Sequence, residues 1–343
     1  MNAPVTLPMM SLELASRELK PAGVDRIPIK SRDQWLQERK GDVTASVAGA
    51  ILGVHEYVTP YGLYMEKAGL APEQEQVTPV IDEDSITLPP LLRGTLFERA
   101  AIDMVRMLRP DWEVSPANDA YYRMPEARIG ATPDAFARRP DIKGLGILQV
   151  KTTDGLIFRQ KWLDEEGSVQ VPLWIAVQAL VEARLTGASW ACVALLVGGI
   201  NTKLHLIDIP LHEGVWARLV EEVREFWRRI EESDPPAPDY GRDGALIAGL
   251  YATDDGTEVD LSSDNRIGEI LDQRAGLKAT ETAGKDAEKR RRELDSEILA
   301  KMGAAARARL ADGRTITAKT IKRSGYTVQP GSYRTVKVKG EAA

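Results

Sequence analysis

Apolar positions recur along this chain with two different spacings, one helical and one alternating or continuous. Helical spacing predicts helices over 31–41, 47–52, 61–68, 94–108, 172–186 and 214–232. Runs rich in β-branched and aromatic residues predict strands over 112–115, 127–137, 146–153, 191–197 and 202–209, with a hairpin turn over 141–146. This order of elements predicts an α/β fold in which a central mixed sheet is flanked by helices.

Proline content and charge divide the chain into four parts. Residues 1–30 contain several prolines and no sustained periodicity, which predicts an irregular lead-in before the α/β domain at 31–234. A Pro-Pro-Ala-Pro run opens a predicted linker region at 235–263. The remainder, 264–343, is a C-terminal extension: an Ala-, Glu-, Lys- and Arg-rich stretch predicts one or two long exposed helices, and a basic alternating tail predicts a small β-element.

Composition adds bounds to this picture. With 343 residues, 43% of them hydrophobic and 28% charged, the chain is typical of a globular protein, and no apolar run reaches membrane-spanning length. The single cysteine, Cys192, lies in an apolar strand and is expected to be a buried thiol in a reducing compartment. The net charge of −6 does not indicate nucleic-acid binding. Basic residues nevertheless gather in the tail, so the protein can have a local positive surface that faces DNA although its net charge is negative.

Candidate chemistry lies around one predicted strand. Glu98 is on the preceding helix, Pro133-Asp134 ends a strand-like run, and Gln149 and Lys151 alternate on one face of the next strand. A hairpin would bring Asp134, Gln149 and Lys151 together. Carboxylates suit Mg²⁺, which needs only one or two of them beside water, and the backbone carbonyl of Val150 is a natural extra ligand. Lys151 could hold and polarise an attacking water.

The order Glu98, Pro133-Asp134 and Gln149-x-Lys151 resembles the PD-(D/E)XK nuclease superfamily, with its restriction-endonuclease-like core. Within it, the chain resembles the YqaJ and lambda-exonuclease type of phage recombination nuclease. The closer resemblance covers roughly 31–197 and rests on these motifs: Asp33-x-Trp35-x-x-x-Arg39-x-Gly41-x-x-Thr44-Ala45-Ser46, Ile51-Leu52-Gly53, Thr59-Pro60, Gly94-x-x-x-Glu98, Gly130-Ala131-Thr132-Pro133-Asp134 and Pro172 … Gln178.

In that family the N-terminal signature binds a DNA 5′-phosphate. The resemblance assigns this role to the guanidinium fork of Arg39 and the hydroxyls of Ser46 and Thr132, and the chemistry agrees, since forked and hydroxyl donors suit phosphate oxygens. Trp35 is expected either to stack on a terminal base or to pack in the core. Gln178 falls on the helix after the catalytic strand, where the family also carries a glutamine near the active site.

The chain departs from the family pattern at Gln149, where an acid is usual. Three explanations are open. The site works with Glu98, Asp134 and an amide ligand; a carboxylate has moved to Glu182, one helical turn after Gln178; or the chain is inactive. Asp154 is a weaker substitute, because strand alternation points it away from Lys151.

The resemblance implies an Mg²⁺-dependent deoxyribonuclease, with Mn²⁺ able to substitute, in the cytoplasm of a bacterial host. We expect an exonuclease that degrades one strand of linear duplex DNA from 5′ to 3′, starting at a 5′-phosphate. The remaining 3′ overhang would pass to a single-strand annealing protein, and a trimeric ring is the implied homo-oligomer. Two rivals remain: an endonuclease or single-strand nuclease with the same site, and a catalytically inactive module that binds DNA ends.

Overall fold

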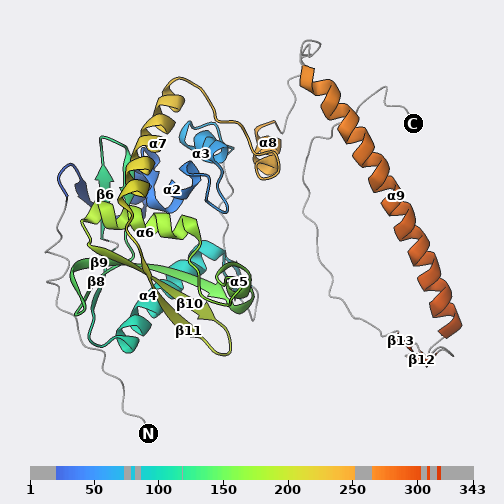
Figure 1. Ribbon diagram of the computed structural model, residues 1–343, viewed down its shortest axis with the longest axis horizontal. Helices are drawn as coiled ribbons and strands as arrows, with labels where there is room; N and C mark the ends of the chain where they lie inside the picture. The colour runs from blue at the N-terminus through green and yellow to red at the C-terminus, as the bar shows by residue number, and fades with distance from the viewer. Residues whose placement is uncertain are drawn as a thin grey trace, which may run out of the picture. The chain divides into compact units, whose positions relative to one another are not determined.

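A computed structural model describes residues 21–72, 79–81, 86–117, 119–251, 265–302, 307–309 and 315–317. Contacts divide the chain into two units, Met1–Leu250 and Tyr251–Ala343. The first unit holds the mixed α/β core (Figure 1). Most of the predicted lead-in (1–20) and most of the predicted β-rich tail (318–339) lie outside the described residues.

Five strands form the central sheet. Their order is β11-β10-β9-β8-β5, and all neighbours are antiparallel except β9 and β10. Both strands of the parallel pair carry near-continuous apolar runs, as expected where both faces of a sheet are covered. The mixed sheet predicted from the sequence is therefore confirmed. The strands are β5 (Glu113–Pro116), β8 (Ala135–Arg139), β9 (Ile142–Asp154), β10 (Trp190–Gly198) and β11 (Lys203–Ile209).

Two helices cover the two faces of this sheet (Figure 1). On one face α4 (Pro90–Leu108) packs against Leu148 and Val150 of β9. On the other, α6 (Leu173–Thr186) packs against Ile147. Because side chains alternate along a strand, Gln149 and Lys151 face α6 together with Ile147. The amino half of α6 is thus positioned over the polar residues of β9.

A second sheet has the order β1-β6-β7-β2, with β2 and β7 parallel. It corrects one prediction: 127–137 is not one strand but two, and β7 and β8 belong to different sheets. The break falls at 132–134, because Pro133 has no backbone N–H to continue a ladder. Short strands without clear alternation had hidden the rest of this sheet. Its members are β1 (Asp25–Pro28), β2 (Val43–Thr44), β6 (Ala120–Met124) and β7 (Ile129–Ala131).

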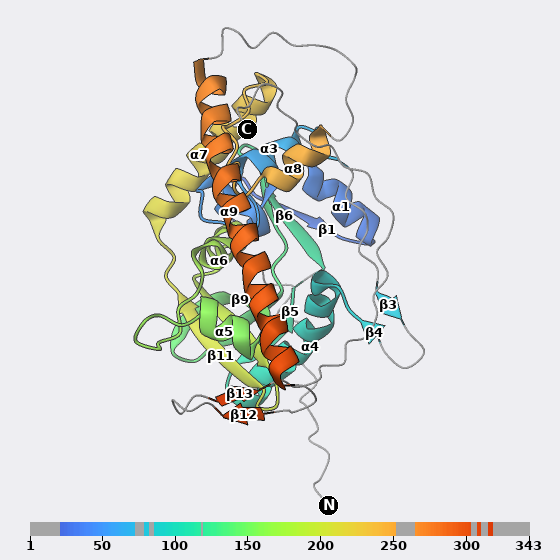
Figure 2. The ribbon, with the colours of Figure 1, turned by 90° about the vertical axis from the view of Figure 1, so that its right-hand side faces the viewer.

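Five further helices surround this framework. Ser31 caps α1 by accepting a hydrogen bond from Gln34 N, and α1 lies alongside β1 and β6 (Figure 2). The helices α2 and α7 pack over α6, which explains why α6 is buried on nearly every side. Their bounds are α1 (Arg32–Lys40), α2 (Ala45–Ile51), α3 (Pro60–Lys67), α5 (Gly155–Lys161) and α7 (Glu213–Glu231), with a short hairpin of β3 (Val80–Ile81) and β4 (Ile86–Thr87).

The region predicted as a linker contains α8 (Gly244–Leu250), which the sequence pattern did not reveal. Leu246, Ile247 and Leu250 pack against the core of the first unit. Asp243 is buried just before this helix, and its carboxylate accepts a hydrogen bond from Thr59 Oγ1 at 2.5 Å. The chain therefore stays attached to the α/β core as far as Leu250.

The second unit contains one long helix, α9 (Asn265–Met302), and a two-stranded ladder of β12 (Arg307–Arg309) and β13 (Thr315–Thr317). Its described side chains are largely exposed, in agreement with the predicted long exposed helix. Among the described residues of both units, no helix is long and apolar enough to cross a membrane.

Candidate metal and DNA-end site

Strand β9 and the segment between β7 and β8 bring three of the predicted residues together: Asp134, Gln149 and Lys151. Asp134 directly precedes β8, and its Oδ2 accepts two hydrogen bonds from β9. One comes from the backbone N–H of Val150 at 2.7 Å and the other from Gln149 Nε2 at 2.5 Å. The hairpin predicted from the sequence therefore places Asp134 against the side chain at the usual acidic position.

A chain of hydrogen bonds fixes which way the amides point. The ammonium of Lys151 donates to Gln178 Oε1 at 2.9 Å. The Nε2 group of Gln178 then donates to Gln149 Oε1 at 2.9 Å and to Glu182 Oε1 at 3.0 Å. An ammonium can only donate, so it selects the oxygen of Gln178 and turns the nitrogen of that residue toward Gln149. The amide nitrogen of Gln149 consequently faces Asp134.

Burial and crowding raise the proton affinity of the acids. Burial, and then the charge of Asp134, raises the pKa of Glu98 to about 7. Burial raises the pKa of Asp134 to about 6 against the opposing influence of Lys151. Burial lowers the pKa of Lys151, which the neighbouring carboxylates partly offset. Glu98, Asp134 and Lys151 therefore share one electrostatic environment.

The oxygen donors around Asp134 fit a hard divalent cation. Within the described ranges, no group of three or more His, Cys, Asp or Glu side chains could hold a metal ion. Mg²⁺, however, often uses only one or two carboxylates and completes its shell with water. Glu98, Asp134 and the carbonyl of Val150 make such a set, and a cation would favour the charged forms of both carboxyls against the burial that raises their pKa values. The oxygen of Gln149 is turned away from this set, toward Gln178.

Glu182 lies behind the amides. Its side chain is 1% exposed, and its Oε2 has no hydrogen-bond partner among the described residues. Burial, and then the charge of Asp134, raises its pKa well above the ordinary range. The weaker substitute, Asp154, caps α5 by accepting hydrogen bonds from Leu156 N and Ile157 N at 2.7 and 3.0 Å. Its carboxylate is therefore engaged away from Asp134.

The four predicted phosphate-binding residues contact one another. Trp35 Nε1 donates to Thr132 Oγ1 at 3.0 Å, and the guanidinium of Arg39 lies 4.1 Å from the centre of the Trp35 ring. Arg39 Nη2 also donates to Ser46 Oγ at 3.2 Å. Thr132 is two residues before Asp134, so this cluster and the candidate metal ligand Asp134 share the segment between β7 and β8.

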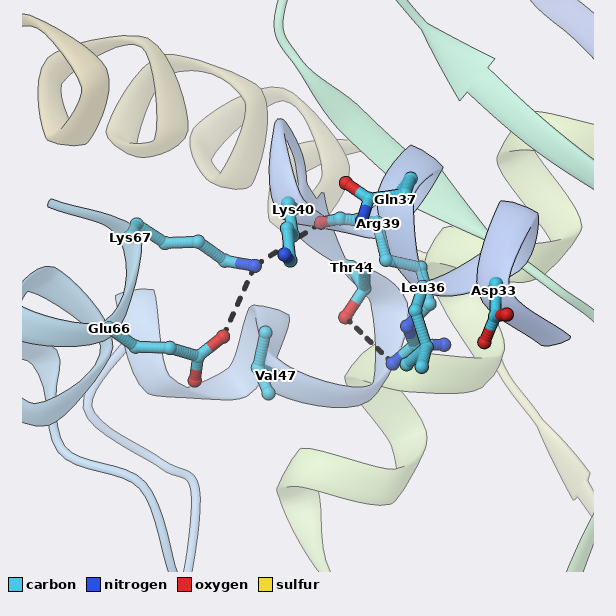
Figure 3. A pocket seen from close by; sticks show the side chains of 9 residues that line it. All are labelled: Asp33, Leu36, Gln37, Arg39, Lys40, Thr44, Val47, Glu66 and Lys67. Atoms are coloured by element: carbon cyan, nitrogen blue, oxygen red, sulfur yellow. Dashed lines mark hydrogen bonds and ion pairs between the residues drawn. The ribbon is translucent and has the colours of Figure 1, made fainter. Parts of the chain in front are cut away.

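A cavity of about 430 Å³ opens beside Arg39 (Figure 3). Three basic side chains line it, Arg39, Lys40 and Lys67, and the buried ammonium of Lys67 contacts Glu66 and the backbone oxygen of Arg39. Burial lowers the pKa of Arg39. The other lining residues are Asp33, Leu36, Gln37, Thr44, Val47 and Glu66.

Two hydrogen-bonded polar residues near this cluster, Asp42 and His55, were not predicted from the sequence. Asp42 is 2% exposed and accepts hydrogen bonds from Tyr121 Oη at 2.9 Å and Arg123 Nε at 2.6 Å. His55 Nε2 lies 3.0 Å from the backbone oxygen of Ser46. An acidic residue directly before the apolar Val43, as Asp42 is, was the available signal for the first. Nothing in the pattern of residues indicated the second.

The segment of the chain that carries these residues is similar to known proteins. Residues 34–189 match the family model of the YqaJ-like viral recombinase domain. The chain is 26% identical over 242 residues to the protein YqaJ of Bacillus subtilis (strain 168), which covers 69% of each. Among solved structures it is similar to an alkaline exonuclease from Laribacter hongkongensis, at 17% identity and a TM-score of 0.43, over 63% of this chain and 100% of that one. The same exonuclease in complex with dAMP gives a TM-score of 0.44 at 16% identity, over 63% and 99% of the two chains.

Proposed function

We propose, from the match of residues 34–189 to the YqaJ-like viral recombinase domain, that the protein is a metal-dependent DNA exonuclease. It would digest one strand of linear duplex DNA from a 5′-phosphorylated end, in the 5′ to 3′ direction. The observation that carries the proposal is the grouping of Glu98 and Asp134 beside Lys151, where burial, joined at Glu98 by the charge of Asp134, raises the two carboxyl pKa values to about 7 and about 6. Such shifts cluster at functional sites.

Each residue has a role in this proposal. Glu98, Asp134 and the carbonyl of Val150 would hold Mg²⁺, with Mn²⁺ able to substitute. The ion would lower the pKa of bound water and neutralise charge on the phosphate. Lys151, held by Gln178, would orient the attacking water. Gln149 would fix the rotamer of Asp134 through its amide nitrogen, in place of the ligand role expected from the sequence.

Hydrolysis adds the water oxygen to phosphorus and breaks the bond to the 3′ oxygen of the departing nucleotide. The strand that remains then begins with a new 5′-phosphate. Arg39, Ser46 and Thr132 would hold that phosphate, because a guanidinium and hydroxyls are suited to phosphate oxygens. Each cut would therefore regenerate the group that the end-binding cluster recognises.

A second candidate function is a catalytically inactive module that binds DNA ends. It is favoured by the amide at Gln149, which supplies a dipole but no charge, and whose oxygen points away from Asp134. An endonuclease or single-strand nuclease with the same residues is the third possibility, and the end-binding cluster argues against it.

The test is digestion of three duplex substrates: linear with a 5′-phosphate, linear with a 5′-hydroxyl, and closed circular. We expect Mg²⁺-dependent release of nucleotides from the first, slower release from the second and none from the third, with Lys151→Ala as the inactive control. Cleavage of closed circles would reveal an endonuclease. Inactivity of the wild type, reversed by Gln149→Glu, would identify an end-binding module.

The product of this reaction suggests the partners. A 3′ single-stranded overhang is the substrate of an annealing protein, which we propose as the partner in recombination. A trimeric ring around the duplex is the proposed oligomer. Light scattering in the presence and absence of duplex DNA would test the ring, and co-purification with an annealing protein on a resected duplex would test the partner.

A further inference from the structure

Two aromatic rings lie side by side in a row that has a lysine at each end, beginning at the proposed catalytic lysine. Lys151 Nζ lies 5.4 Å from the centre of the Trp174 ring. The rings of Trp174 and Tyr57 are 6.1 Å apart at an angle of 78°, and Lys161 Nζ lies 5.4 Å from the centre of the Tyr57 ring. These four side chains come from β9, α6, the loop between α2 and α3, and α5. We call them the aromatic row.

The outer ring of this row is both exposed and held in place. Tyr57 is 69% exposed. Its loop is fastened by His55, whose Nδ1 accepts from Tyr57 N at 3.1 Å and Val58 N at 3.0 Å, so Nε2 carries the proton and donates to Ser46 O. Arg242 fastens the same loop by donating to the backbone oxygens of His55 and Glu56 at 2.6 and 3.0 Å.

A rigid exposed aromatic is unusual for a loop whose only task is to connect two helices. Lys161 lies over one face of the Tyr57 ring, and the large exposed fraction of the side chain leaves another part of the ring accessible. Adjacent rings flanked by ammonium groups match single-stranded DNA, whose bases stack on aromatic side chains while its phosphates attract cations. Lys161 is paired with Glu56, which a phosphate would have to displace.

We infer that the aromatic row is a binding track for the DNA strand at the cutting site, with a nucleobase stacked on Tyr57 and a phosphate near Lys161. This inference rests on the proposed function, because the row is continuous with Lys151. It adds a subsite outside both the metal-binding residues and the 5′-phosphate cluster. The track would hold unpaired nucleotides without selecting a sequence, since every base has a face that can stack.

Stacking can be measured without cleavage. Oligonucleotides carrying 2-aminopurine at successive positions from a 5′-phosphorylated end are titrated in EDTA, and fluorescence quenching reports stacking while anisotropy gives Kd. We expect quenching at one position near the end with the wild type and with Tyr57→Phe. Tyr57→Ala should lose that quenching and weaken binding about 5- to 150-fold. Tyr240→Ala, at a tyrosine that is 78% exposed, is the matched control and should bind as the wild type does.

The charge at the outer end of the row gives an independent measurement. Lys161→Gln should flatten the dependence of log Kd on log salt by roughly 0.7, the slope of one contact to a single strand. Glu56→Gln, which releases Lys161 from its ion pair, should tighten binding. Both variants change exposed or half-exposed side chains, and thermal unfolding would verify that they fold.

The outcomes separate this inference from the proposed function. If the wild type binds and digests DNA while Tyr57→Ala binds equally well with unchanged quenching, the track is wrong and the exonuclease proposal stands. If the wild type binds DNA through Tyr57 but digests none, the track stands and the exonuclease proposal fails. A Tyr57→Ala variant that changes only self-association, seen by sedimentation, would make the row a protein interface and overturn the inference.

Discussion

The amide nitrogen of Gln149 donates a hydrogen bond across 2.5 Å to Oδ2 of Asp134, the acid expected to bind the metal. A glutamate at the same place would put two carboxylates together. The glutamine instead stabilises the charge of its neighbour, and the direction of its amide is set by Lys151 through Gln178. The direction of the Gln149 amide therefore depends on the ammonium of Lys151, which lies two residues further along β9.

Replacing Gln149 by glutamate should make folding depend on divalent cations. Gln149→Glu exchanges a hydrogen bond for charge repulsion, which we expect to cost about 2 kcal/mol in the absence of metal. For a domain of this size that lowers Tm by about 4–8 °C. Mg²⁺ should restore most of the loss in a thermal unfolding experiment. Gln149→Ala loses the same hydrogen bond without adding charge, so Mg²⁺ should raise its Tm less than that of Gln149→Glu; equal responses in both variants would contradict the arrangement.

Glu182 can be tested as a substitute acid or as a positioning residue. Burial raises the pKa of its carboxyl and so favours the neutral form, which Glu182→Gln should imitate while preserving the acceptor for Gln178 Nε2. We expect Glu182→Gln to digest DNA at the wild-type rate, and Glu182→Leu to lose up to about 100-fold in kcat because Gln178 and Lys151 lose their alignment. If Glu182→Gln is as slow as Glu182→Leu, a charged Glu182 is required and the carboxylate has moved there from position 149.

Arg39 should determine the preference for a 5′-phosphate. The guanidinium is oriented by Trp35 and Ser46, and a charged hydrogen bond to phosphate contributes about 1.5–3 kcal/mol. Arg39→Ala should therefore reduce the ratio of kcat/KM for 5′-phosphate over 5′-hydroxyl ends by about 10- to 150-fold. Arg39→Lys keeps the charge but loses the fork, and we expect it to recover only part of the ratio. An unchanged ratio in Arg39→Ala would place phosphate recognition elsewhere.

Cys192 should be inert in the folded protein. Burial raises the pKa of its thiol to about 12, from an ordinary value near 9. Because the folded state holds the proton more tightly, its contribution to stability is present below pH 9 and is lost as the pH rises toward 12. Iodoacetamide at pH 8 should therefore alkylate Cys192 only as urea unfolds the chain. Rapid alkylation of the native protein would mean that β10 opens on the time scale of the reaction.

Periodicity and motif spacing predicted the parts of this fold that have strong local patterns. The core helices, the hairpin into β9 and the grouping of Asp134 with Gln149 and Lys151 follow from alternation and from short connections. The small sheet of β1, β2, β6 and β7 could not be predicted, because its strands are two to five residues long and pair across distant segments. The helix α8 was hidden because its apolar residues follow a proline-rich run.

The candidate site shows the same division. Residue types and order led to Glu98, Asp134 and Lys151, but not to the direction of the Gln149 amide, which depends on a contact with Gln178 on another element. Nor could spacing show that Trp35 donates to Thr132, because 97 residues separate them. Both relationships are set by packing between elements, and a single sequence carries no local signal for packing.

The break at Pro133 has one more consequence. Thr132, which contacts the end-binding cluster, and Asp134, which faces the proposed metal ligands, are joined by a single residue whose φ angle is fixed by its ring. In the exonuclease that we propose, the grip on the 5′ end and the point of cutting are thus parts of one stiff tripeptide. A shift of Thr132 on binding the 5′ end would therefore reach Asp134 through one residue, so occupancy of the end-binding cluster and placement of the proposed metal ligand are coupled along the backbone.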